Sequence, residues 1–331
     1  MGLVPLTILA RSNRNARRLA GVLLFFAFVL GGCAHIVPQS VQLTESWPAE
    51  LPPKVELADV PFFAQDDYQC GPTALATTLR HAGVPVVPDD LVREVYLPAR
   101  HGSLQVEMIA APRRHGLVSY QLDGSLETVL REVAAGNPVI VLQDFGVWPV
   151  KIWHYAVVIG YERDSHRVIM RSGLNRRQEA PFAALEYTWK GSDRWAMVAL
   201  SPQRIPATAQ AERYTQAVVD FARVASPQAA RRAYEAVLAR WPGNVAAQVG
   251  LSNILYSAGD LKGSEALLRD AAARHPESVP VLNNLAQVLS DQGRLDEALA
   301  TIQRAARDAG PYAAAVEDTR RSIEKRRAGA R

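Results

Sequence analysis

Cysteine is scarce in this chain of 331 residues, which contains only Cys33 and Cys70. Two cysteines are too few for the disulfide framework that holds many small secreted domains together. They are also too few for a cysteine-rich zinc site, and the seven histidines show no metal-binding spacing such as H-E-x-x-H. We therefore expect no metal and no other cofactor.

Acidic residues are absent from residues 1–32, which hold four arginines. Without this segment the chain has 33 basic and 33 acidic residues, so its formal net charge of +4 belongs to the amino terminus. The neutral remainder gives no electrostatic reason to expect nucleic acid as a partner. With 48% hydrophobic residues the chain can bury a core, and its length favours two folded domains.

An apolar run long enough to span a bilayer is missing from the amino terminus. Leu19–Leu30 is apolar throughout and follows a basic flank, but it is shorter than the roughly 17–25 residues that a spanning helix needs. This pattern is typical of a signal peptide. The sequence Leu30-Gly31-Gly32-Cys33 then resembles the lipobox of bacterial lipoproteins, which implies that residues 1–32 are removed and that Cys33 is lipidated.

Lipid on Cys33 predicts a protein anchored in the bacterial cell envelope and facing the periplasm. Ala34, in place of aspartate, favours the outer membrane over the inner membrane. Residues 33–54 contain four prolines among mostly polar residues and predict a tether that lifts the next domain off the membrane. Cys70 is then the one free thiol in an oxidising compartment, either buried or kept for its reactivity.

Residues 55–201 combine helical and strand patterns and predict one domain. Apolar stripes predict helices at 70–83, 104–115 and 126–135. Apolar runs between turns predict strands at 138–142, 154–161, 167–170 and 195–200. Because the helices come first and the strands second, we expect an α+β fold with helices packed on an antiparallel sheet.

Three residues of this domain predict acyl-transfer chemistry. Cys70 begins the first predicted helix, where exposed N–H groups and the helix dipole favour the thiolate. His154 begins a strand about one domain-length later, as expected for the base of a cysteine nucleophile. Gln65 lies shortly before the cysteine, where its amide can donate to a tetrahedral oxyanion.

Several sequence blocks resemble the C39 and C39-like cysteine peptidases, over roughly residues 58–175. The blocks are Gln65 with Cys70-Gly71-Pro72-Thr73-Ala74-Leu75, Gly102-Ser103-Leu104-Gln105, Asn137-Pro138-Val139-Ile140-Val141, and the eight residues from His154 to Tyr161. The resemblance implies a papain-like fold with Cys70 as nucleophile, His154 as base and acid, and Gln65 in the oxyanion hole. Bacteriocin-processing members cut after a double-glycine leader within ATP-driven exporters. This chain has no P-loop motif, so that substrate does not carry over.

The third catalytic position departs from the family pattern. The family usually has an aspartate followed by proline at the end of the strand after the histidine, where this chain has Arg171-Ser172-Gly173. Ser172, Asn175 and Asp164 remain candidates for the third member. Because a site without the carboxylate is weaker, the alternative is a non-catalytic C39-like adaptor that binds peptides. Cell-wall cutting by an NlpC/P60-type enzyme is a third option, which the Gln-Cys-Gly-Pro block argues against.

A linker at 202–210 leads into an Ala- and Leu-rich region at 211–327 that repeats every 34 residues. The matched positions are Leu251 and Leu285, Gly259 and Gly293, Leu261 and Leu295, Ala271 and Ala305, and Pro242 and Pro276. This period resembles TPR repeats, with clear repeats at 245–278 and 279–312. TPR arrays usually bind a protein or peptide in a groove, although so short an array also fits stabilisation of the first domain or self-association.

Together these patterns predict a membrane-tethered cysteine peptidase that acts through Cys70 and His154 on a peptide or protein. The TPR array is expected to dock a partner or the substrate.

Overall fold

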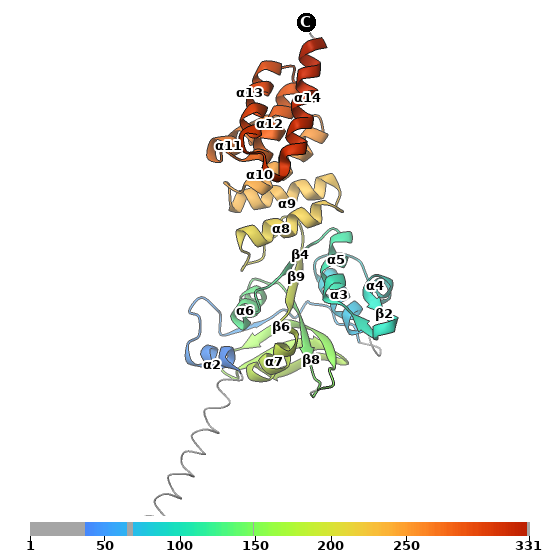
Figure 1. Ribbon diagram of the computed structural model, residues 1–331. Helices are drawn as coiled ribbons and strands as arrows, with labels where there is room; N and C mark the ends of the chain where they lie inside the picture. The colour runs from blue at the N-terminus through green and yellow to red at the C-terminus, as the bar shows by residue number, and fades with distance from the viewer. Residues whose placement is uncertain (1–36, 65–68, 148, 330–331) are drawn as a thin grey trace, which may run out of the picture.

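The computed structural model describes residues 37–64, 69–147 and 149–329. A sheet covered by helices occupies the chain up to residue 200, and a stack of helices follows from residue 211 (Figure 1). The predicted order, an α+β domain followed by an all-α array, is confirmed. Among the described residues, no helix is long and apolar enough to cross a membrane.

An antiparallel sheet forms the centre of the first region. Within the described residues it has seven strands in the order β4-β9-β5-β6-β7-β8, and β1 pairs with the end of β6 that β5 does not reach. The strands are β1 (Lys54–Glu56), β4 (Val118–Gln121), β5 (Val139–Asp144), β6 (Trp153–Glu162), β7 (Arg167–Ser172), β8 (Asn175–Pro181) and β9 (Ala196–Leu200). A separate hairpin joins β2 (Tyr96–Leu97) to β3 (Gly102–Ser103).

Helices cover both faces of this sheet, so β5 and β9 are buried along their whole length. One face shares a core with α3 (Cys70–His81), α4 (Pro88–Val95) and α5 (Gln105–Arg114). The other face shares a core with α6 (Leu126–Ala134) and α7 (Phe182–Trp189). Strands covered on both faces tend to carry continuous apolar runs, and Val139–Leu142 of β5 is such a run, which made it recognisable in the sequence.

The predicted helices and strands of this domain are present, with ends shifted by a few residues. The sequence patterns did not predict β4, β8, α4 or α7. β8 is a mostly exposed strand at the edge of the sheet and carries charged side chains, so it lacks the apolar alternation that identifies a half-buried strand. Its pairing with β7 comes from the hairpin geometry.

The segment predicted as a tether is partly folded onto the domain. Residues Pro38–Glu45 form helix α2, and the buried carboxylate of Glu186 in α7 accepts hydrogen bonds from the Gln39 N–H (3.1 Å) and the Ser40 N–H (2.7 Å). Trp47 stacks on Phe182 at 6.3 Å between ring centroids. An acceptor at a helix start satisfies N–H groups that have no partner within the helix, so α2 is fixed in place and is not a free spacer.

The helical array has antiparallel helix pairs that continue the predicted repeats. Its helices are α8 (Ala211–Ala222), α9 (Pro227–Arg240), α10 (Val245–Ser257), α11 (Leu261–Arg274), α12 (Val279–Asp291), α13 (Leu295–Ala305) and α14 (Ala313–Gly329). The two predicted clear repeats correspond to α10–α11 and α12–α13. Another helix pair, α8 and α9, precedes them. Tyr234 of α9 packs so closely on α10 that a Cβ at Gly250 would lie 2.3 Å from its ring.

The array is joined to the first domain by a continuous core. Helix α8 packs against β4, with the rings of Tyr214 and Tyr120 at 5.8 Å. The linker is held by Glu132, a buried carboxylate in α6 that accepts hydrogen bonds from the Thr208 N–H (2.7 Å) and hydroxyl (2.6 Å) and from Asn137 (2.6 Å). The two regions therefore pack as one body at this junction.

We expect Glu132→Gln to destabilise the protein. An amide cannot accept all of these hydrogen bonds and brings its own donors, so the free energy of unfolding should fall by about 2 kcal/mol. Urea unfolding followed by circular dichroism measures this change. Glu127→Gln is the matched control, because Glu127 lies on the same helix in a half-buried pair with Arg131. It should change the free energy of unfolding by less than about 0.5 kcal/mol. Equal effects of the two variants would contradict a role for Glu132 in holding the linker.

Candidate functional site

Cys70 is the first residue of α3, and burial of the helix fixes its position. Every residue from Gly71 to Leu79 is buried, and Pro72 occupies the first turn. Arg80 and His81 in the last turn suit the negative end of the helix dipole. No side chain caps the start of α3, so the backbone N–H groups of its first turn remain near the cysteine.

Gly71 allows a close approach between α3 and β3. A Cβ at this position would lie 2.2 Å from the hydroxyl oxygen of Ser103, so a larger residue would push the two elements apart. Tyr155 in β6 donates its hydroxyl to the Ser103 carbonyl at 3.2 Å. These contacts fix the helix start, β3 and β6 relative to one another.

His154 is the second residue of β6 and is half-buried. Its Nε2 lies 2.9 Å from the Ser172 hydroxyl at the end of β7. The Phe145 ring lies 5.6 Å from the imidazole and covers part of it. With Nε2 engaged by Ser172, Nδ1 is the ring nitrogen left for chemistry.

Cys70 and His154 line the same cleft, which has a volume of about 1140 Å³. The wall around them comes from β3, from the start of β6, from the turn after β7 and from the turn after α7. These lining residues are His101, Gly102, Ser103, Leu104, Gln105, Leu142, Lys151, Ile152, Trp153, Tyr155, Gly173, Leu174, Gly191, Ser192 and Asp193. The structure therefore brings together the two residues that the sequence separates by 84 positions.

Burial favours the uncharged forms of both groups. Burial raises the pKa of the Cys70 thiol, although hydrogen bonds from the backbone of Tyr155, Gly71 and Cys70 itself act in the opposite direction. Burial also lowers the pKa of His154. The thiolate expected from the helix start is therefore disfavoured, because loss of solvent outweighs the helix-terminal N–H groups.

Only one of the three candidates for the third position contacts His154 in the described structure. Ser172 is buried and bonded to the imidazole. Asn175 is exposed at the start of β8, and Asp164 is exposed in the turn at the far end of β6, where it pairs with Arg163. A hydroxyl orients the ring, but it stabilises an imidazolium less than a carboxylate does.

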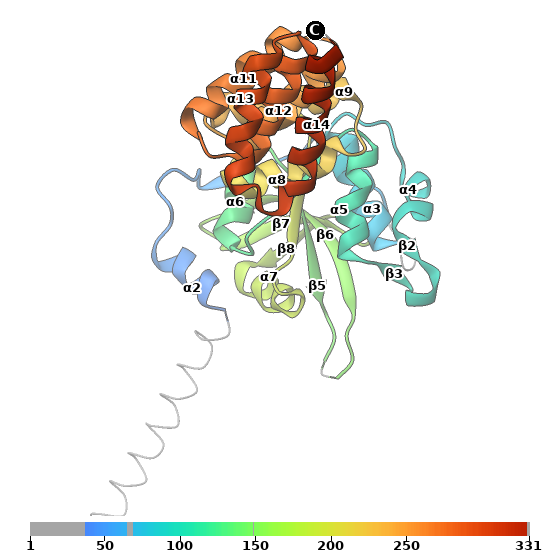
Figure 2. The ribbon, with the colours of Figure 1, turned by 45° about the horizontal axis from the view of Figure 1, so that its top comes forward.

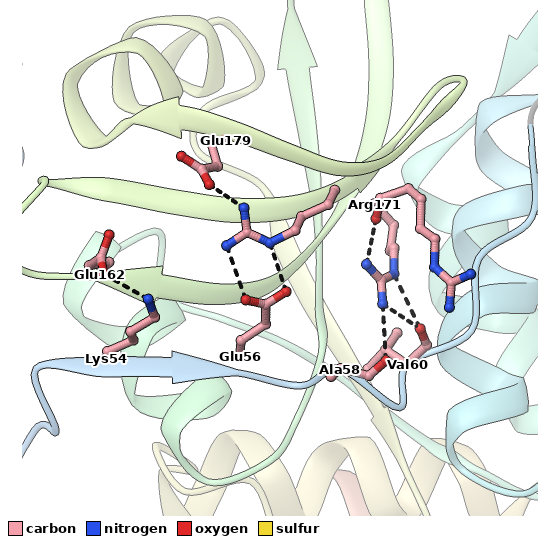
Figure 3. Close-up of polar contacts among 9 residues, drawn as sticks. Lys54, Glu56, Ala58, Val60, Glu162, Arg171 and Glu179 are labelled. Atoms are coloured by element: carbon pink, nitrogen blue, oxygen red, sulfur yellow. Dashed lines mark hydrogen bonds and ion pairs between the residues drawn. The ribbon is translucent and has the colours of Figure 1, made fainter.

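Arg171, beside Ser172, ties the chain before Cys70 to the His154 side of the sheet (Figure 3). Its guanidinium donates to the Val60 carbonyl (2.8 and 3.2 Å), to the Ala58 carbonyl (3.3 Å) and to the Arg176 carbonyl. Burial lowers the pKa of Arg171. The arginine therefore supports the segment at Ala58 and Val60, which leads toward the cysteine.

Asp144 and Lys151 are cleft-side residues that the sequence patterns did not identify. Burial opposes ionisation of Asp144. Hydrogen bonds from Lys151 (2.6 Å) and from the N–H groups of Gly146 (3.0 Å) and Ile152 (3.1 Å) outweigh burial and lower the pKa of that carboxyl. The only available sequence signal was an acid at the end of an apolar strand, which is too common to be informative.

Two predicted residues, Gln65 and Cys33, lie outside the residues that the structure describes. Their roles as oxyanion donor and lipid attachment site stay predictions. Among the described residues, no group of three or more His, Cys, Asp or Glu side chains is placed to hold a metal ion.

Comparison with known proteins identifies both regions. Residues 57–197 match the Peptidase_C39 like family, and residues 215–279 and 255–318 match two tetratricopeptide repeat families. A crystal structure described as a C39-like peptidase from Bacillus anthracis is 21% identical, with a TM-score of 0.39. The match covers 44% of this chain and 97% of that one. No curated protein matches the sequence.

We expect Ser172→Asp to raise the pKa of His154, because a carboxylate beside the ring favours its charged form. Titration of the imidazole by NMR measures this shift, and it should be about one unit or more. Asn175→Asp is the matched control and should leave the pKa nearly unchanged, since Asn175 is exposed and makes no described contact with the ring. A larger shift in the Asn175 variant would show that Ser172 is not the partner.

Proposed function

Because this chain carries a C39-like peptidase domain followed by tetratricopeptide repeats, we propose that it is a cysteine peptidase tethered to a membrane. The observation that carries the proposal is the common cleft of Cys70 and His154, with Ser172 bonded to the far nitrogen of the imidazole. A nucleophile, a base and a group that orients the base are the minimum set for covalent acyl transfer.

The protonation states support general-base catalysis. A thiol and a neutral imidazole are the starting pair. If Nε2–H donates to the Ser172 oxygen, Nδ1 carries the lone pair that takes the thiol proton as the sulfur attacks a peptide carbonyl. The backbone hydrogen bonds around the sulfur stabilise the charge that develops on it.

In the remaining steps of the reaction, the backbone at the start of α3 helps to bind the oxyanion. The tetrahedral oxyanion is held by the Cys70 backbone N–H and by the amide of Gln65, as the family resemblance implies. Collapse expels the amine, which takes a proton from His154 and leaves a thioester on Cys70. Water activated by His154 then hydrolyses the thioester and restores the thiol.

The anchor is proposed to be lipid on Cys33, which places the protein in the bacterial envelope facing the periplasm, with the outer membrane preferred. The docked helix α2 limits how far such an anchor reaches. The five steps from Cys33 to Pro38 span at most roughly 18 Å when extended. An anchored domain is thus held close to the membrane surface.

The helical array is proposed to dock the substrate or a protein partner, as repeats of this kind do. Its rigid junction with the peptidase-like domain supports this role, since a bound chain is then presented at a constant position relative to the cleft.

We expect an N-acetylated amino-acid p-nitrophenyl ester to acylate Cys70. Intact-mass spectrometry measures the adduct and p-nitrophenolate release measures the rate. Cys70→Ala should abolish acylation while its circular dichroism spectrum stays unchanged, and His154→Ala should slow acylation about 100-fold. The rate should fall at acid pH as His154 becomes protonated. The midpoint should lie below 6.5, because burial lowers this pKa.

The competing function is the non-catalytic adaptor, which is favoured by a hydroxyl, that of Ser172, in place of a carboxylate as the partner of His154. No acyl adduct on wild-type protein, together with unaltered function of a Cys70→Ser strain, would establish the adaptor and reject the peptidase.

We expect Cys33→Ala to release the protein from the membrane. Wild-type protein should sediment with membranes, incorporate labelled palmitate and leave the pellet in detergent, because acyl chains bury many methylenes in lipid. Cys70→Ala is the matched cysteine control and should still incorporate the label. Membrane association of the Cys33 variant equal to wild type would contradict the anchor.

A further inference from the structure

The hairpin between β5 and β6 extends beyond the rest of the sheet (Figure 2). It carries several large apolar side chains that remain exposed, including Val147 (82%) and Ile152 (56%). Leu174, in the turn between β7 and β8, is also exposed (75%). Exposed apolar residues that gather at one place often mark a binding site.

Four of the exposed apolar residues that the structure describes line the cleft. Leu104 directly follows β3, and the other three, Ile152, Trp153 and Leu174, are called the apolar rim. Ile152 and Trp153 directly precede His154 in the chain. Leu174 follows Ser172 by two residues, and Ser172 is bonded to His154 at 2.9 Å. The whole rim therefore lies on the His154 side of the cleft, across from the start of α3.

The base of the hairpin is held in one position, which orders Ile152 and Trp153 before anything binds. The Asp144 carboxylate accepts from the N–H groups of Gly146 and Ile152 and so closes the hairpin at its neck. A Cβ at Gly146 would lie 2.0 Å from the Val150 carbonyl, and a Cβ at Gly191 would lie 2.6 Å from Asp144. A fixed surface loses less conformational entropy when a ligand binds.

Lys151, which directly precedes Ile152 in the chain, is already paired. Lys151 reaches Asp144 at 2.6 Å and lies 5.7 Å from the centre of the Trp153 ring. This pairing neutralises the lysine, so the rim offers mainly apolar surface and an aromatic face to a ligand.

The chemistry of the cleft determines which part of a substrate meets this surface. In the proposed reaction His154 protonates the amine that leaves, so the residue that carries this amine lies on the His154 side. We propose that the apolar rim binds the side chain of that residue, which follows the cleaved bond, and selects a bulky apolar one. This inference rests on the proposed function, because it assigns the leaving group of the same reaction.

Partitioning of an acyl-enzyme tests this specificity without knowledge of the natural substrate. The p-nitrophenyl ester acylates Cys70 and releases p-nitrophenol. The thioester then reacts either with water, which gives an acid, or with an added amino-acid amide, whose nitrogen displaces the thiol, loses a proton to His154 and forms a peptide bond. The ratio of the two products measures binding of the amine component alone.

We expect leucine amide and phenylalanine amide to capture the acyl group about tenfold better than glycine amide or aspartate amide, the usual scale for an apolar pocket. Ile152→Ser and Leu174→Ser should lower this preference about five- to tenfold. Val147→Ser is the matched control, since Val147 is on the same hairpin and exposed but does not line the cleft. It should show the wild-type preference for leucine amide and phenylalanine amide.

The outcomes separate this inference from the function on which it rests. An acyl-enzyme that partitions equally among the four amides would overturn the apolar rim and leave the peptidase proposal standing. Equal loss of preference in the Val147 variant would also overturn the rim, because it would point to a general effect of the hairpin. Failure to form any adduct on Cys70 would overturn both.

Discussion

The contact between helix α3 and strand β6 places the chemistry of this protein. Helix α3 packs against β6, and the backbone of Tyr155, the residue that directly follows His154 in the strand, acts to lower the pKa of Cys70 at the helix start. Gly71 and Ser103 close the other side of the same contact. Because α3 is buried along most of its length, the cysteine cannot move away from β6 without loss of apolar burial, which is the main driving force of the fold.

Burial also determines the electrostatics of the site. It raises the pKa of Cys70 and lowers the pKa of His154, so the same desolvation keeps both groups neutral. A neutral pair makes a weaker nucleophile at rest than an ion pair, but it keeps the imidazole ready to accept a proton. Ser172 fits this arrangement, since a hydroxyl orients the ring without favouring its charged form.

The segments on either side of the peptidase-like domain limit how the domain is oriented relative to other molecules. Two buried carboxylates, Glu186 and Glu132, receive the backbone N–H groups of α2 and of the linker, respectively. Helix α2 and the linker are therefore both fixed on the surface of the domain. A lipid anchor in front and a repeat array behind would hold the cleft in a defined orientation.

Local patterns in the chain were sufficient for much of this description. The apolar stripe of α3, the apolar runs of β5 and β6 and the 34-residue period of the array each have their cause within a short stretch of residues, so the fold class, the helical array and the pair Cys70 and His154 could be predicted. The patterns failed for elements whose formation or position depends on contacts between residues far apart in the sequence. The charged strand β8 pairs only because β7 is beside it, and α2 is docked by an acid 146 residues away from Ser40.

Three further features also depend on long-range contacts. They are the contact of His154 with Ser172 and not with Asn175 or Asp164, the raised pKa of the cysteine, and the apolar rim. Each depends on which side chains share a buried space and how much water they lose. That information arises only when strands from distant parts of the chain are paired in register.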